Sequence, residues 1–140
     1  MEEAAILLKE AGARRVLPLK VSGPFHSPLL NTAGEKLAEV LAPCKLSGLK
    51  IPYISNTLAE PVTDKTKIKD LLTRQISSPV RWRESMEELI REGVGTFIEI
   101  GPGKTLSGFL KKIDRNAVVY SIQTMEDLEK TVELLKGRNL

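Results

Sequence analysis

Apolar residues recur at the three- and four-residue spacing of helices in several segments of the chain. The predicted helices cover residues 3–11, 28–41, 66–76, 83–92, 104–113 and 125–136. Shorter apolar runs predict strands over residues 16–21, 51–55, 96–100 and 117–122. Because strands and helices alternate, the pattern predicts an α/β layer built on parallel strands.

Local signals mark where several of these helices begin. Ser27 stands directly before Pro28, so we expect Ser27 to cap the helix and Pro28 to be its first residue. Residues 60–64 are predicted to form a loop that ends in Asp64, a candidate cap for the next helix. The stretch Thr124–Asp127 resembles a capping box for the last helix.

The predicted helix over 66–76 carries a polar residue on its apolar face. That face consists of Ile68, Leu71, Leu72 and Ile76. Gln75 shares it, seven residues after Ile68. A glutamine that points inward must find hydrogen-bond partners. Gln75 therefore either ties down a loop or marks a place where the end of the helix meets a polar site.

His26 is the single histidine of the chain and the first candidate for chemistry. It stands on a short Gly-Pro turn between a predicted strand and a predicted helix, where loop residues often carry function. A nucleophile to partner it is not visible, because the pattern G-x-S-x-G does not occur in these residues. Ser27 is expected to be a helix cap, and Cys44 follows a helix end without a cluster of cations.

A glycine-rich turn is the second candidate for ligand binding. The residues Gly101-Pro102-Gly103-Lys104 follow a predicted strand and open a helix, so their amides could cradle a phosphate. They fit neither G-x-x-x-x-G-K-[ST] nor G-x-G-x-x-G. A tight turn between strand and helix is the favoured interpretation.

Composition excludes several classes of function. The 140 residues carry a net charge of +3, with 4% aromatic residues and no basic run interleaved with aromatics, so nucleic-acid binding is not indicated. A single cysteine and a single histidine make neither a disulfide nor a zinc site, which indicates no metal and suits the cytoplasm. No apolar stretch reaches membrane-spanning length, and Met1-Glu2-Glu3 is too acidic to begin a signal peptide.

Four motifs in order are familiar as a set. They are Val21-Ser-Gly-Pro-Phe-His-Ser-Pro-Leu-Leu30, Ile51-Pro-Tyr-Ile-Ser-Asn-Thr57, Arg74-Gln75 with Ser78-Pro-Val-Arg-Trp82, and Glu99-Ile-Gly-Pro-Gly-Lys104. From about Met1 to Arg115 the chain resembles the C-terminal part of the malonyl-CoA:acyl carrier protein transacylases of fatty acid synthesis. That family's Gly-His-Ser-Leu-Gly nucleophile and its carboxylate-binding arginine lie in a first half that these residues do not include.

The resemblance implies a partial α/β-hydrolase-like, or acyltransferase, parallel-sheet core. Residues 1–21 correspond to the last helix and strand of a small ferredoxin-like subdomain, and residues 22–140 to the C-terminal part of the core. A parallel sheet without its neighbouring strands exposes apolar edges. We therefore expect this piece alone to be marginally stable, to self-associate through the exposed edge of the sheet, or to be rearranged.

The resemblance also implies ping-pong acyl transfer from malonyl-CoA to the phosphopantetheine thiol of acyl carrier protein, with no further cofactor. His26 matches the catalytic histidine, and Gln75 matches the residue whose main-chain oxygen orients it. Asn56 is a candidate for a further hydrogen bond at this site. Phe25 resembles the bulky residue of malonyl-selective relatives, which leaves little room for an α-methyl branch.

Two other functions stay open beside the transacylase interpretation, in which this chain alone is expected to be inactive. One is a non-catalytic domain that docks an acidic carrier protein through Lys104, Lys111, Lys112 and Arg115. The other is a self-sufficient hydrolase with Ser27 or Cys44 as nucleophile.

Overall fold

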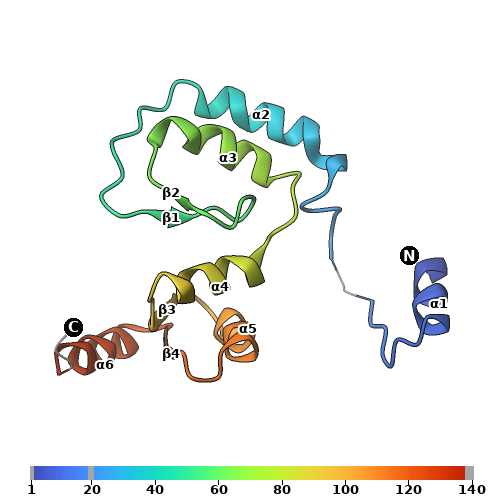
Figure 1. Cartoon of the computed structure of the whole chain (residues 1–140). Coiled ribbons are helices and arrows are strands. Elements are labelled where there is room, and N and C mark those ends of the chain that lie inside the picture. Colours follow the sequence, from blue (N-terminus) through green and yellow to red (C-terminus); the bar gives the residue numbers. More distant parts are fainter. Residues whose placement is uncertain (1, 19–20, 138–140) are drawn as a thin grey trace.

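The computed structural model describes residues 2–18 and 21–137, and each predicted helix is present in it (Figure 1). The helices are α1 (Glu2–Glu10), α2 (Asn31–Leu41), α3 (Ile68–Gln75), α4 (Trp82–Arg91), α5 (Thr105–Ile113) and α6 (Met125–Lys136), with short 3₁₀ turns η1 (Pro28–Leu30) and η2 (Lys65–Lys67). The strands are β1 (Tyr53–Ile54), β2 (Pro61–Val62), β3 (Thr96–Ile100) and β4 (Val118–Ile122).

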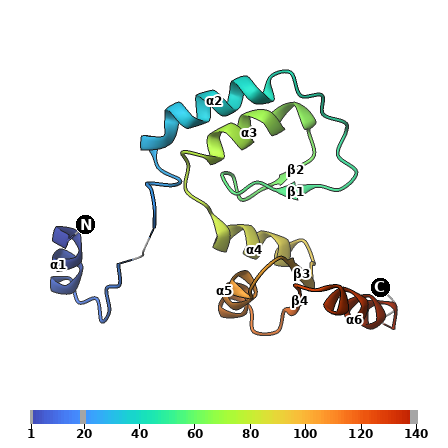
Figure 2. The ribbon, with the colours of Figure 1, turned by 180° about the vertical axis from the view of Figure 1, so that it is seen from behind.

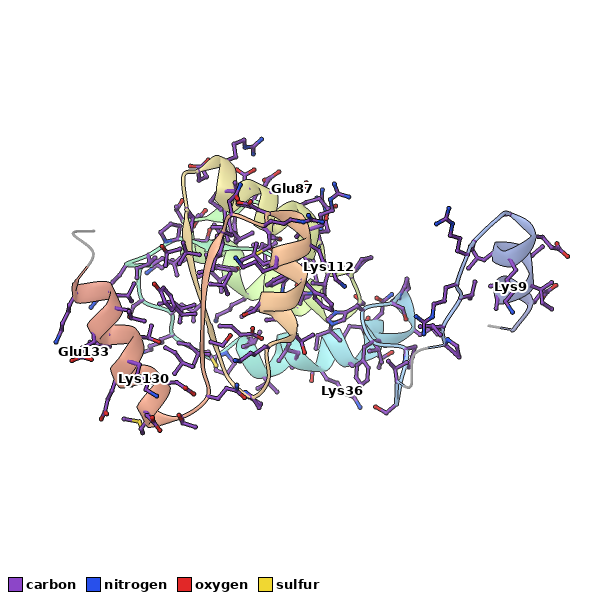
Figure 3. The ribbon with its side chains drawn as sticks, turned by 90° about the horizontal axis from the view of Figure 1, so that it is seen from below. Lys9, Lys36, Glu87, Lys112, Lys130 and Glu133 are labelled. Carbon is purple, nitrogen blue, oxygen red and sulfur yellow. The ribbon has the colours of Figure 1, made fainter. Side chains whose placement is uncertain are left out.

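These elements form two lobes, which are separate in both Figure 1 and Figure 2. The first lobe packs α2 and α3 with the hairpin β1–β2, around a cluster of Val62, Ile68 and Leu71. The second lobe packs α4 and α5 with β3 and β4, around Met86 and Leu110. Helix α1 lies away from both lobes, and Figure 3 shows Lys9 on α1 well apart from Lys36 on α2.

The parallel α/β prediction is confirmed in the second lobe. Strands β3 and β4 pair in parallel, with register from Thr96 opposite Val118 to Ile100 opposite Ile122. Helix α5 connects the two strands, as parallel neighbours require. The fold is therefore α/β around a short parallel ribbon.

The hairpin of the first lobe corrects the prediction. Tyr53 and Ile54 pair antiparallel with Val62 and Pro61, so the predicted strand over 51–55 is shorter than expected and is not parallel. Its partner lies within residues 60–64, where a loop was expected. The period of apolar residues could not reveal β2, because it is only two residues long.

The strand predicted over 16–21 is wrong for its described residues. Residues 16–18 and Val21 form no strand, and Leu19 and Lys20 lie outside the described residues. Apolar residues here meet no partner strand within the described chain, and Pro18 removes one ladder donor.

Two of the three predicted caps are confirmed. The Asp64 carboxylate accepts a hydrogen bond from the Thr66 N–H at 2.8 Å, and Thr124 with Asp127 forms the expected capping box. Ser27 occupies the predicted N-cap position, before Pro28, but its side chain makes no capping hydrogen bond, so the expected cap is wrong. Its hydroxyl instead donates to the Pro24 carbonyl at 2.7 Å, so it closes the turn that precedes the helix.

Several large apolar side chains are exposed. Leu29 is 80% exposed, Val40 66% and Ile100 79%. Parallel sheets usually have both faces covered, yet no described element covers these side chains. Self-association through the sheet edge therefore stays a prediction.

The Glu99 side chain, on β3, caps the start of α5. Its carboxylate accepts from the backbone N–H groups of Leu106 and Ser107, at 3.1 and 2.8 Å, and from the Ser107 hydroxyl. Lys104, at the N-cap position, provides no side-chain cap. Glu99 therefore occupies two amides at the start of α5, and in the turn itself the Gly103 N–H donates to Gln123 Oε1 at 2.9 Å, so these groups are not free to bind a phosphate.

We predict that Glu99→Gln flattens the loss of stability in acid. The Ser107 side chain, then the backbone amides of Ser107 and Leu106, hold the pKa of Glu99 below its ordinary value. Its stabilisation is thus fully present above a pH of about 4.3 and is lost as pH falls through the folded-state pKa. Urea denaturation midpoints measured across this range should fall less steeply for the variant. Glu129→Gln, at an exposed position on α6, is the control, and equal slopes for both variants would contradict the prediction.

A second constraint is the close contact of α2 with α3 at Gly34. A Cβ on this buried glycine would lie 3.2 Å from the Thr73 carbonyl oxygen. At the other end of the helix pair, the Lys69 ammonium donates to the Ala42 carbonyl at 2.7 Å.

We predict opposite effects of the same substitution in two helices. Gly108→Ala in α5, where nothing lies within 4 Å, should raise the free energy of unfolding by about 0.5–1 kcal/mol through helix propensity. Gly34→Ala should lower it, because the methyl group pushes against a helical carbonyl. Chemical denaturation of both variants measures the difference. An equal gain from both would show that α2 can move away freely.

Candidate functional site

His26 lies on a tight corner between Gly23 and the 3₁₀ turn η1. Its φ is 58°, a left-handed conformation that histidine adopts more readily than most residues. The Ser27 hydroxyl bonds to the Pro24 carbonyl, and the Leu30 N–H bonds to the Ser27 carbonyl at 3.0 Å. These bonds hold the corner in a conformation that costs backbone strain, a feature often found at functional sites.

Two nitrogens of His26 contact the carboxyl end of α3. The backbone N–H donates to the Ile76 carbonyl at 3.2 Å, and the ring Nδ1 lies 2.9 Å from the Gln75 carbonyl oxygen. The last carbonyls of a helix have no partner within the helix. The end of α3 therefore offers acceptors that fix both the backbone and the ring of His26.

The contacts of Nδ1 identify which ring nitrogen carries the proton. The Gln75 side-chain Nε2 lies 3.3 Å from the same Nδ1. Nδ1 cannot donate to the carbonyl and accept from this amide at once. We assign the proton to Nδ1, because the carbonyl contact is shorter. If the side-chain oxygen and nitrogen of Gln75 exchange places, the oxygen becomes a second acceptor for the Nδ1–H. Nε2 of His26 is left with its lone pair, as a general base requires.

The ring borders an apolar groove of about 520 Å³ between α2 and α3. The lining residues are Phe25, His26, Leu30, Ala33, Leu37, Leu41, Leu72, Gln75 and Ile76. The exposed ring of Phe25 thus stands in the same groove as the imidazole. The structure brings together three of the four residues that were predicted for the site.

Asn56 is the predicted residue that does not line this groove. It is exposed in the turn between β1 and β2, and its backbone carbonyl accepts from the Arg81 N–H at 2.9 Å. Its role at the site stays a prediction.

The two candidate nucleophiles of the hydrolase alternative do not line the groove either. Ser27 donates its hydroxyl to Pro24, and Cys44 is exposed, with its thiol 3.5 Å from the Val40 carbonyl. Neither side chain has a described contact with the imidazole.

Sequence reasoning missed the Ile76 carbonyl and the capping role of Glu99. Ile76 acts through its main chain, which no residue type encodes. For Glu99, the signal was present in the sequence: no capping side chain stands at position 104, so another residue must satisfy the first amides of α5.

Neither a metal-ligand cluster nor a membrane-spanning helix is present in the described part of the chain. Within it, no three histidine, cysteine or carboxylate side chains gather as metal ligands. No helix among the described residues has the length and apolarity needed to cross a bilayer.

Comparisons with known proteins extend this picture, although no family model matches the chain. It is similar to the malonyl CoA-acyl carrier protein transacylase of Bacillus subtilis (strain 168), at 49% identity over 139 residues, which cover 99% of this chain and 44% of that protein. It is also similar to the crystal structure of the malonyl CoA-acyl carrier protein transacylase from Clostridium perfringens ATCC 13124. That match has 41% identity and a TM-score of 0.88, and it covers 97% of this chain and 43% of the other.

A third relative is a malonyl-transacylase that was solved in complex with its type II PKS acyl-carrier protein. It matches with 36% identity and a TM-score of 0.87, over 94% of this chain and 43% of that one. In each case the chain spans less than half the length of the relative.

The fold and these likenesses define part of an α/β acyltransferase. The chain corresponds to one part of the malonyl CoA-acyl carrier protein transacylases, as its motifs predicted. The partial coverage is consistent with the expected correspondence to one part of the family's length.

We predict that the neutral ring of His26 carries its proton on Nδ1. Because His26 is the single histidine, long-range ¹H–¹⁵N NMR spectra contain one pair of imidazole nitrogens to assign. Gln75→Ala should preserve this tautomer, because the principal acceptor is the main-chain oxygen. A shift of the proton to Nε2 in the unsubstituted chain would contradict the assignment.

Proposed function

We propose that this chain supplies the catalytic histidine of a malonyl transacylase of fatty acid synthesis. The enzyme transfers malonyl from CoA to the phosphopantetheine thiol of acyl carrier protein by a ping-pong mechanism. The observation that carries the proposal is the 2.9 Å contact between His26 Nδ1 and the Gln75 carbonyl oxygen, beside an apolar groove.

In the first half-reaction, Nε2 of His26 accepts the proton of a serine hydroxyl while the serine oxygen attacks the malonyl thioester carbon. A C–O bond forms, the C–S bond breaks, and the proton passes from Nε2 to the departing CoA sulfur. In the second, Nε2 accepts a proton from the carrier thiol, the sulfur attacks the ester, and the serine oxygen takes the proton back. The nucleophilic serine of the family's Gly-His-Ser-Leu-Gly motif is not among these 140 residues. We propose that this chain is inactive without that serine.

The carboxyl end of α3 has two tasks in this mechanism. The Gln75 carbonyl keeps the proton on Nδ1, so that Nε2 is free to accept another. It also stabilises the positive charge that the ring gains in transit, because the end of a helix carries partial negative charge.

The remaining residues of the groove bear on selectivity. Its leucines and isoleucine form an apolar wall, which disfavours the entry of water to a malonyl ester. In this proposal the Phe25 ring leaves little room for an α-methyl branch and favours malonyl. Asn56 is proposed to add a hydrogen bond once the site is complete.

Acyl carrier protein is the proposed partner, beside CoA thioester, and no other cofactor is invoked. A relative solved in complex with an acyl-carrier protein supports this partner. A cytoplasmic location is part of the same proposal.

The relative in complex with an acyl-carrier protein also favours carrier docking as the second candidate function. The docking surface is smaller than the sequence suggested. The Lys111 ammonium donates to the carbonyls of Arg115 and Ala117, at 3.2 and 2.6 Å, so it is held by the chain itself. Lys112, on α5 in Figure 3, lies over the Phe109 ring at 5.7 Å. The docking surface is then Lys104, Lys112 and Arg115.

A chimaera tests the proposed function. The part of the Bacillus subtilis relative that the chain does not span is placed ahead of it in one polypeptide, in the order of the family. We expect transfer of malonyl from CoA to carrier protein, and a loss of roughly 100-fold or more with His26→Ala, since general base catalysis contributes 10²–10⁴. Lys36→Ala, at an exposed position of α2 that does not line the groove, is the control and should leave transfer unchanged.

Two results would redirect the assignment. Transfer that is indifferent to His26→Ala would remove His26 from the mechanism. A salt-sensitive complex between this chain and carrier protein, formed while His26→Ala is without effect, would favour the docking function.

A further inference from the structure

Arg81 joins the two lobes of the protein. It stands directly before α4, and its backbone N–H donates to the Asn56 carbonyl at 2.9 Å. Its Nη1 donates to the Leu58 carbonyl at 2.8 Å. Asn56 and Leu58 belong to the turn between β1 and β2, so backbone and side chain of one residue grip two carbonyls of the same turn.

Arg81 also makes hydrogen bonds with the first turn of α4. Its carbonyl accepts from the Ser85 N–H at 3.0 Å and from the Ser85 hydroxyl at 2.7 Å, and its Nε pairs with Glu84 at 3.2 Å. Ser85 is only 2% exposed. The first turn of α4 is thus rigid where it meets the hairpin.

The turn that Arg81 holds has strain of its own. Ala59 has a φ of 58°, which L side chains rarely adopt, and it is buried. Its N–H donates to the Ser55 carbonyl at 2.7 Å, and the Ser55 N–H donates to the Glu60 carbonyl at 3.1 Å. A strained turn persists only where its surroundings hold it. Arg81 contributes two hydrogen bonds that hold this turn, to the Asn56 and Leu58 carbonyls.

The segment that ends at Arg81 begins at the site. The Gln75 and Ile76 carbonyls are fixed by His26, and five residues further Arg81 is fixed to the hairpin turn. We infer that Arg81 is a positioning residue of the transacylase site, which sets the Asn56–Leu58 turn against the segment that orients His26. This inference rests on the proposed function.

The geometry of the guanidinium explains why arginine stands at this position. Its planar fork reaches the Leu58 carbonyl and the Glu84 carboxylate together. A lysine ammonium on a flexible stem cannot reproduce both contacts with the same geometry. Arg81→Lys should therefore recover only part of the function.

The chimaera described above tests the inference with Arg81→Ala, Arg81→Lys and the control Arg83→Ala. Arg83 lies in the first turn of α4, two residues after Arg81, and pairs only with Glu87 among the described contacts. The amount of acyl-enzyme formed in the initial burst gives the number of competent sites, and kcat is calculated per competent site. We expect Arg81→Ala to lower kcat by roughly 10- to 100-fold, as a small misplacement does, with KM for malonyl-CoA unchanged. Arg81→Lys should be intermediate, and Arg83→Ala should match the unsubstituted protein.

Hydrogen exchange of the Ser55 and Ala59 amides is the second measurement, in the same proteins. Exchange should be faster in Arg81→Ala than in Arg83→Ala. An unchanged kcat per competent site overturns the inference, as does equal exchange in the two variants. If the unsubstituted chimaera transfers no malonyl, or His26→Ala leaves transfer intact, the proposed function fails, and the exchange comparison still decides whether Arg81 holds the turn.

Discussion

The hydrogen bonds between His26 and the end of α3 are the interaction on which the site depends. A helix ends with carbonyls that lack partners, and a corner residue with positive φ can direct its N–H and its ring to the same place. The Gln75 and Ile76 carbonyls receive one donor each. The helix end gains partners, and the ring loses its freedom to rotate. Because the acceptors are main-chain atoms, the position of α3 matters more than the identity of its last side chains.

That position is set by packing. Helix α3 buries Ile68 and Leu71 on the hairpin, and it contacts α2 so closely at Gly34 that a methyl group would meet the Thr73 carbonyl. Since α2 follows the His26 corner directly, the same packing brings both partners of the key contact together. The geometry of the proposed site is thus a consequence of helix packing.

The sequence predicted what repeats or what a side chain encodes. Helical periodicity located every helix within about a turn, and the caps at Asp64 and Thr124 were recognisable because side chains make them. The hairpin partner Pro61–Val62 is too short to have a period, and the run at 16–18 has the composition of a strand without a partner. At the site, Gln75 could be found because a polar residue broke an apolar face. The Ile76 carbonyl could not, because a main-chain acceptor has no letter in the sequence.

The exposed apolar surface bears on the proposed function. Side chains such as Leu29 and Ile100 are too exposed for a chain whose stability depends on burial, and the two-stranded parallel ribbon has neither face fully covered. The proposed base and the carbonyl that orients it nevertheless lie within one continuous stretch, from His26 to Ile76. The fold around them matches that of the Clostridium perfringens relative with a TM-score of 0.88. In this proposal the groups for proton transfer can therefore come from separate polypeptide segments, each of which orients its own group. Burial of the apolar surface instead requires that the segments pack together. The imidazole is already oriented by its own lobe, whereas the groove beside it becomes a water-excluding site only when further apolar surface closes over it.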